Sequence, residues 1–175
     1  MYYSTSYESP IGRLTLASDG EHLIGVWLEG QKYFGGSLAD ELAEKDDLSV
    51  FSAAKAWLDQ YFAGEKPLPS ALPLQPIGGE FRQQVWSLLC QIPYGQVTTY
   101  GALAEELASR MGKTRMSSQA VGGAVGHNPI SIIIPCHRVV GANGSLTGYA
   151  GGISVKARLL EHEGVDMSHL FVPKK

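Results

Sequence analysis

The stretch EKPLPSALPLQPIGG, residues 65–79, divides this 175-residue chain into two parts. It holds four prolines between Lys66 and Pro76, which favour neither a helix nor a central strand, so it predicts a linker. The net charge changes sign there. Residues 1–76 hold 5 Lys/Arg and 11 Asp/Glu, a net charge of −6, whereas residues 77–175 hold 9 and 6, a net charge of +3. We therefore predict two domains, 1–76 and 77–175.

The first part is rich in strand signals. Short runs of aromatic, aliphatic and β-branched residues at 2–7, 14–17 and 23–28 are separated by turn-forming Pro and Gly. Apolar residues at helical spacing over 50–63 predict a helix, and Gly64 would end it. This pattern predicts an α/β domain, a small antiparallel sheet plus one helix.

The second part reads as mainly helical. Apolar stripes predict helices over 80–91, 100–109 and 154–163. Cys90, on the first of these helices, is expected to be an inert core residue. The apolar run 130–134 predicts a buried strand between the last two helices.

A further helix is predicted over 119–126, QAVGGAVG, after the helix over 100–109. Its three glycines cost up to about 1 kcal/mol each relative to alanine, which a sequence tolerates when something must approach the backbone closely. The pair predicts a helix-turn-helix that reads DNA shape and backbone, for instance in the minor groove. Packing of the glycines against another element stays equally open. The capping candidates are Thr98 or Thr99 for the first helix and Ser117 or Ser118 for the second.

The octapeptide IPCHRVVG, residues 134–141, places the thiol of Cys136 beside an imidazole and a guanidinium. A cysteine among cations is expected to ionise and act as a nucleophile, although a buried structural cysteine is the alternative. From residue 110 to 158 the chain has six cations and no carboxylate, which predicts a positive surface suited to nucleic acid. These cations are Arg110, Lys113, Arg115, Arg138, Lys156 and Arg158.

Adjacent residues of an extended strand point to opposite faces, so proton transfer from Cys136 to His137 needs a tight bend or a bridging water. A base also needs a third group to orient it. The carboxylates of the second part are Glu80, Glu105, Glu106, Glu161, Glu163 and Asp166. Glu163 lies closest in sequence to the basic region, but the residues alone leave this choice open.

Five motifs occur in order between residues 80 and 165: PYGQVTTYGALA, AVGGAVGHNP, IPCHRVVG, GYAGG and LLEHEG. Together they resemble the O6-alkylguanine-DNA alkyltransferase family, the methylated-DNA–protein-cysteine methyltransferases. The resemblance implies a ribonuclease-H-like N-terminal domain and a C-terminal helix-turn-helix that enters the minor groove of duplex DNA. It also implies irreversible, once-only transfer of an alkyl group from a flipped O6-alkylguanine to the protein's own cysteine, with O4-alkylthymine as an open second substrate.

By position, the resemblance makes Cys136 the alkyl acceptor, His137 a base acting through a water, and Glu163 the group that polarises it. Tyr100 would assist nucleotide rotation, and Asn128 would brace the site. The residues implied in DNA or substrate binding are Arg115, Gln119, Ala120, Gly122, Gly123, Val139, Tyr149, Ala150, Gly151 and Lys156. The chain departs from the family pattern twice: Gln119 replaces the arginine that enters the base stack, and Ala150 replaces a pocket hydroxyl.

The remaining expectations are absences. No metal-binding or cofactor motif, signal peptide or membrane-length apolar run is found, so we expect no metal, no cofactor, no membrane association and a cytoplasmic monomer. Two other functions stay open. A Cys-His-Glu hydrolase would turn over acyl substrates without DNA, and a DNA-binding lesion sensor would not need the thiol.

Overall fold

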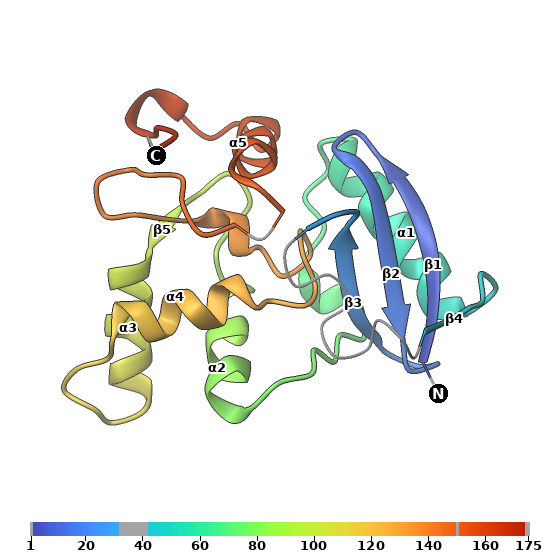
Figure 1. Cartoon of the computed structure of the whole chain (residues 1–175), viewed down its shortest axis with the longest axis horizontal. Coiled ribbons are helices and arrows are strands. Elements are labelled where there is room, and N and C mark those ends of the chain that lie inside the picture. The colour runs from blue at the N-terminus through green and yellow to red at the C-terminus, as the bar shows by residue number, and fades with distance from the viewer. Residues whose placement is uncertain (1, 32–41, 150, 174–175) are drawn as a thin grey trace. The chain divides into compact units, whose positions relative to one another are not determined.

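The computed structural model describes residues 2–31, 42–149 and 151–173. It forms two compact units, residues 1–77 with 129–133 and residues 78–128 with 134–175 (Figure 1). The strands are β1 (Tyr2–Ser9), β2 (Gly12–Ser18), β3 (Leu23–Leu28), β4 (Leu42–Glu44), β5 (Thr98–Thr99) and β6 (Val139–Val140). The α-helices are α1 (Ser49–Phe62), α2 (Glu80–Leu89), α3 (Tyr100–Arg110), α4 (Ser118–Gly126) and α5 (Ile153–His162), and the 3₁₀ turns are η2 (Pro69–Ala71), η3 (Cys136–Arg138) and η4 (Met167–His169).

The first unit is a four-stranded sheet in the order β3-β2-β1-β4, with α1 packed on the three longer strands (Figure 1). β1 pairs antiparallel with β2, and β2 pairs antiparallel with β3, as predicted. β4 pairs parallel with β1, so the sheet is mixed rather than wholly antiparallel. The apolar stripe of α1 is buried against the sheet, which confirms the helix predicted from its spacing.

The segment Pro129–Ile133 also belongs to the first unit, although it follows α4 in the chain. The predicted strand over 130–134 is wrong. Only Ile130 forms a bridge, with Val26, and the chain then turns, with Ile132 at a φ of 72°. A short buried apolar run cannot be assigned to a strand by periodicity. Here the Ser131 amide bonds to Val26 O, and local turn bonds take the place of a strand ladder.

The second unit is built on α2, α3 and α4, which contact one another. Trp86 of α2 is buried, and its indole Nε1 donates to Ala124 O of α4 at 2.9 Å. Of the capping candidates, Thr99 accepts from the Ala102 amide and Ser117 from the Ala120 amide. These caps fix where α3 and α4 begin. The fold class predicted for the second part is therefore confirmed.

β5 and β6 form a short parallel pair, with Thr98 opposite Val139. This pair brings the start of α3 beside the segment that follows η3. The last helix, α5, ends at His162, and Gly164 takes a φ of 81° just beyond it, as a helix C-terminus favours. Among the described residues, none of the helices combines the length and the apolar character that a bilayer crossing requires.

Candidate active site around Cys136

Cys136 is the first residue of the 3₁₀ turn η3, and Pro135 precedes it as the N-cap. The Arg138 amide donates to Pro135 O at 3.0 Å and closes the turn. The chain therefore turns at Cys136 and is not an extended strand there. Cys136 itself is 6% exposed.

The expectation that surrounding cations ionise the Cys136 thiol in the free protein is wrong. Burial raises the pKa of Cys136, and this effect outweighs a hydrogen bond from Asn128 and the charge of Lys156, which both lower it. The guanidinium of the neighbouring Arg138 bonds to Glu163 instead. The thiol therefore rests protonated, and its reaction as a nucleophile requires a base.

His137, Arg138 and Glu163 form a buried cluster. Glu163 Oε2 lies 2.6 Å from His137 Nε2, and the Arg138 guanidinium donates to both carboxylate oxygens, at 2.8 and 3.1 Å. The carboxylate side chain is fully buried. Backbone groups complete the cluster, because the Gly95 amide donates to Glu163 Oε1 at 3.0 Å and Arg138 donates to Ile92 O at 2.6 Å.

The charge states in this cluster follow from burial and pairing. Burial alone would raise the pKa of Glu163, but the hydrogen bonds and charges of His137 and Arg138 hold it well below its usual range. Burial lowers the pKa of His137, against the opposing effect of Glu163. The imidazole is therefore neutral and the carboxylate ionised. Because an ionised carboxylate can only accept, His137 donates from Nε2, and its Nδ1 carries the lone pair.

Lys156 and Tyr100 meet at one backbone carbonyl. Lys156 Nζ donates to Thr147 O at 2.7 Å, and Tyr100 OH donates to the same oxygen at 2.9 Å. Lys156 Nζ also lies 5.9 Å from the centroid of the Tyr100 ring. Burial raises the pKa of Tyr100 to about 12 and lowers the pKa of Lys156 to about 8. Tyr100 and Lys156, which the resemblance had implicated, are thus both held by the carbonyl of Thr147, a residue that the sequence gave no reason to select.

Asn128 lies just beyond α4 and is buried. Its side-chain Nδ2 donates to Ile134 O at 2.7 Å, two residues before Cys136. Its additional hydrogen bond to the Cys136 side chain places it directly at the thiol. The bracing position expected for Asn128 therefore agrees with its contacts.

The prediction of one six-cation surface is wrong for two of its members. Arg138 is 6% exposed and paired with Glu163, and Lys156 is fully buried beside Thr147 O. Arg110, Lys113, Arg115 and Arg158 are exposed. Sequence shows charge but not the direction of a side chain, so it assigned the two buried cations to the surface.

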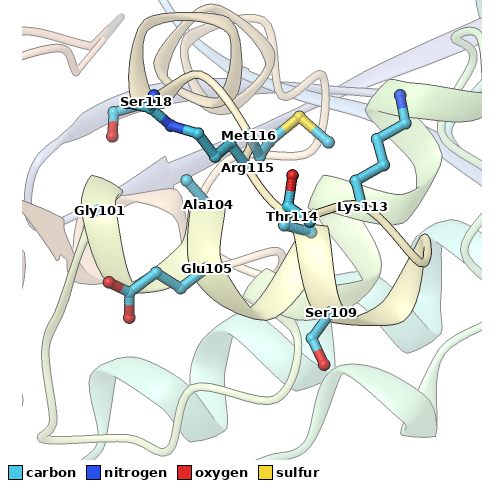
Figure 2. Close-up of a pocket in the computed structure, with 10 residues that line it drawn as sticks. Gly101, Ala104, Glu105, Ser109, Lys113, Thr114, Arg115, Met116 and Ser118 are labelled. Carbon is cyan, nitrogen blue, oxygen red and sulfur yellow. The ribbon is translucent and has the colours of Figure 1, made fainter.

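Two of these exposed cations, Lys113 and Arg115, line a crevice of about 560 Å³ formed by α3 and the residues that connect it to α4 (Figure 2). Ser109 and Ser118 add hydroxyl groups to its lining. The crevice therefore presents cationic and hydroxyl groups that can contact an anionic backbone, together with one carboxylate, Glu105, that would oppose such a contact.

The glycines of α4 are not required by packing. Gly123 is exposed, and a Cβ added there would meet nothing within 4 Å. A Cβ on Gly122 would make only ordinary contact with the Tyr100 ring, at 3.7 Å. Gln119 and Ala120 are exposed near the start of the same helix. The helix thus has a smooth, accessible stretch, and the alternative of packed glycines is not supported at Gly122 or Gly123.

The remaining predicted site residues differ in exposure. Val139 is buried, whereas Tyr149 and Gly151 are half-buried. Ala150 lies outside the described residues. Sequence reasoning also missed Gly148, where a Cβ would lie 2.7 Å from Tyr100 OH at a φ of 77°. Gly148 is the first residue of the motif GYAGG, and that motif was the signal that could have drawn attention to it.

No group of three or more His, Cys, Asp or Glu side chains suited to a metal ion occurs within residues 2–31, 42–149 and 151–173. Cys90, the second cysteine, is partly buried in unit 2, and burial raises its pKa to about 11, with the charge of Arg138 opposing. Cys136 differs from Cys90 in that polar and titratable residues, Asn128, Lys156 and the adjacent His137, lie next to it.

Two family models match the chain. One is described as 6-O-methylguanine DNA methyltransferase, DNA binding domain, and covers residues 80–165; the other is its ribonuclease-like domain and covers residues 1–76. The methylated-DNA–protein-cysteine methyltransferase of Haemophilus influenzae is 42% identical over 93% of this chain and 87% of its own. That of Methanosarcina acetivorans is 46% identical, over 94% and 99%. The crystal structure of Mycobacterium tuberculosis OGT in complex with DNA is 42% identical, covers 93% of this chain and 91% of that chain, and has a TM-score of 0.76.

Proposed function

Because this chain belongs to the 6-O-methylguanine DNA methyltransferase family, as its motifs predicted, we propose that it repairs O6-alkylguanine in DNA by transferring the alkyl group to its own Cys136. One observation carries the assignment of the acceptor: Cys136 directly precedes, in the same turn η3, a buried, neutral His137 that is fixed by an ionised Glu163. A nucleophile, a base and a group that orients the base are the parts that such a transfer needs.

In the proposed reaction His137 takes the thiol proton at Nδ1 through a bridging water, and Glu163 stabilises the imidazolium that forms. The thiolate attacks the alkyl carbon, so that an S–C bond forms as the bond from that carbon to O6 breaks. The electron pair of the broken bond stays on the base, which takes up one proton, equivalent to the one that the thiol gave to His137, and becomes guanine. The product is a thioether, which water does not cleave under mild conditions, so each chain reacts once.

Other side chains would act on the substrate. Tyr100 would assist rotation of the nucleotide, then give up its bond to Thr147 O and donate to the flipped base, near Lys156. The backbone at Cys136 and Val139 would accept from the guanine exocyclic amine. Tyr149 and Gly151 would line the pocket. These proposed lining residues belong to the second unit, as does the short β5–β6 pair that contains Val139.

We place the DNA on α4, in the minor groove, with the target base flipped out of the stack. The exposed Gly123 and Ala120 would allow the sugar–phosphate backbone to approach, and Gln119 would enter the stack in place of an arginine. Arg115 would contact a phosphate from the crevice beside α3. We further propose that the protein acts as a monomer in the cytoplasm.

Intact-mass measurement tests this function. The protein is incubated with a duplex that contains one O6-methylguanine, and we expect the mass to rise by one methyl group per chain and then stop. Cys136→Ala should gain nothing, whereas Cys90→Ala, which removes the other thiol, should gain one methyl group. Mass gain in Cys136→Ala, or repeated turnover without mass gain, would contradict the proposal.

A further inference from the structure

Residues 166–171, which we call the C-terminal strap, run beside the loop that follows β6 (Figure 1, red and orange). The Leu146 amide donates to Phe171 O at 2.9 Å, and the Phe171 amide donates to Gly144 O at 3.0 Å. This pairing forms a parallel bridge between Ser145 and Phe171. The strap therefore provides the backbone hydrogen-bond partners of the Leu146 amide and the Gly144 carbonyl in the loop.

Side chains hold the strap in the same place. Met167 and Leu170 pack against a buried cluster of Val140, Leu146 and Leu160. Leu146 is thus fixed by backbone and side chain together. Burying apolar side chains on both sides of this contact stabilises the strap against the loop.

Gly144 shows how closely strap and loop approach. It has a φ of 91°, and a Cβ built on it would lie 2.0 Å from His169 O, a backbone atom that cannot move aside without displacing the strap. Any other residue at 144 would meet both backbone strain and this collision.

The loop residue after Leu146 is Thr147, whose carbonyl accepts from both Tyr100 OH and Lys156 Nζ. We infer that the C-terminal strap positions this carbonyl, and through it Lys156 and, until the flipped base replaces the carbonyl as its acceptor, Tyr100, for alkyl transfer at Cys136. The inference rests on the proposed function and deepens it. It makes Phe171 and Gly144 positioning residues that contact neither DNA nor the reacting atoms.

Phe171→Pro tests the inference in the full-length chain. Proline removes the amide that bonds to Gly144 O, and the extended conformation of Leu170 (φ −112°, ψ 149°) suits a residue before proline. We expect the single-turnover rate of methyl transfer at saturating DNA to fall roughly 10- to 100-fold, because misplacement of about 1 Å at a reacting site has effects of that size. The affinity for unmodified duplex should stay within about twofold of the wild type, because α4 is not altered.

Two controls separate the backbone from the side chain. Phe171→Ala keeps the amide and loses a ring that is already 45% exposed, and Val172→Pro places the same proline ring one residue further on. Both should react at the wild-type rate. A second pair avoids proline: Gly144→Ala should slow transfer, whereas Gly64→Ala carries a similar φ of 86° with nothing within 4 Å and should not.

The outcomes are distinct. If wild-type protein transfers no methyl group, the proposed function fails. If the wild type transfers it and both Phe171→Pro and Gly144→Ala match their controls, the strap does not position the site and this inference is overturned. An equal loss of transfer rate and DNA affinity would also overturn it, because that would indicate general unfolding of the second unit.

Discussion

Glu163→Gln is the substitution for which the structure gives the clearest expectation. The carboxylate accepts from His137, from two Arg138 nitrogens and from the Gly95 amide, and its side chain is fully buried. Glutamine has nearly the same shape but one carbonyl oxygen and one NH₂ group. The NH₂ group must face a donor, so at least one charge-assisted bond is lost, and the Arg138 guanidinium is left without its counter-charge.

The magnitude follows from that arrangement. Removing one partner of a buried ion pair costs about 3–5 kcal/mol, because the other charge stays desolvated. For a chain of this size 1 kcal/mol corresponds to about 2–4 °C, so the melting temperature should fall by roughly 6–20 °C. The effect should depend on pH. The lowered pKa of Glu163 gives stability that is present above the unfolded-state pKa of about 4.3 and lost as the pH falls further. The difference in free energy of unfolding between Glu163→Gln and the wild type should therefore become smaller at acidic pH.

Urea denaturation of the full chain measures this cost. Glu161→Gln is the matched control, because Glu161 is exposed near the same end of α5. Arg138→Met combined with Glu163→Gln removes both charges and should recover part of the loss, which a double-mutant cycle reports as coupling energy. A loss below about 1 kcal/mol for Glu163→Gln, or no recovery in the double variant, would refute the assignment of a buried, ionised Glu163.

Three further predictions follow from described contacts. Burial lowers the pKa of His137, so below a pH of about 6.5 the unfolded chain binds a proton that the native imidazole does not bind, and the free energy of unfolding should fall as the pH drops. His137→Phe should make this pH dependence weaker, whereas the control His169→Gln, at an exposed site, should leave it unchanged. Gly123→Ala should stabilise the protein by up to about 1 kcal/mol and weaken DNA binding in a mobility-shift titration; unchanged affinity would contradict DNA contact at this face. Gln119→Arg should speed repair and tighten binding, and a variant that does neither would show that the charge is not needed for base extrusion.

The elements predicted correctly are those with strong local signals. α1 carries six buried residues at helical spacing, and α3 and α4 begin at hydroxyl caps that sequence placed within one residue. β4 was missed because three residues, Leu42–Glu44, contain no alternation to read; their pairing with β1 is a tertiary contact. The segment 130–134 was misassigned for a related reason, since its one bridge, between Ile130 and Val26, is a tertiary contact that its own pattern does not show.

The site was predicted in part. Cys136 and His137 could be selected from their side-chain chemistry. Glu163 was one of six candidate carboxylates in the second part; the family resemblance favoured it, and the 2.6 Å distance between its Oε2 and His137 Nε2 supports that choice. The roles of Thr147 O and the Gly95 amide were beyond prediction, because every residue has a carbonyl and nearly every residue an amide. Local composition cannot show which of these groups turns toward a site.

Charge in the sequence predicted DNA as the partner, but two of the six cations on which that prediction rested are not on the surface. Arg138 and Lys156 were counted as surface charge, yet both are buried, where one neutralises Glu163 and the other lies on Thr147 O. The absence of acidic residues between 110 and 158 therefore has two consequences: the exposed cations suit a phosphate backbone, and the carboxylate that is buried among the described residues, Glu163, reaches the buried cations from beyond residue 158. A second carboxylate near Cys136 would raise the pKa of the thiol further and oppose thiolate formation. The same scarcity of acids that suits DNA binding thus also serves the chemistry of the thiol.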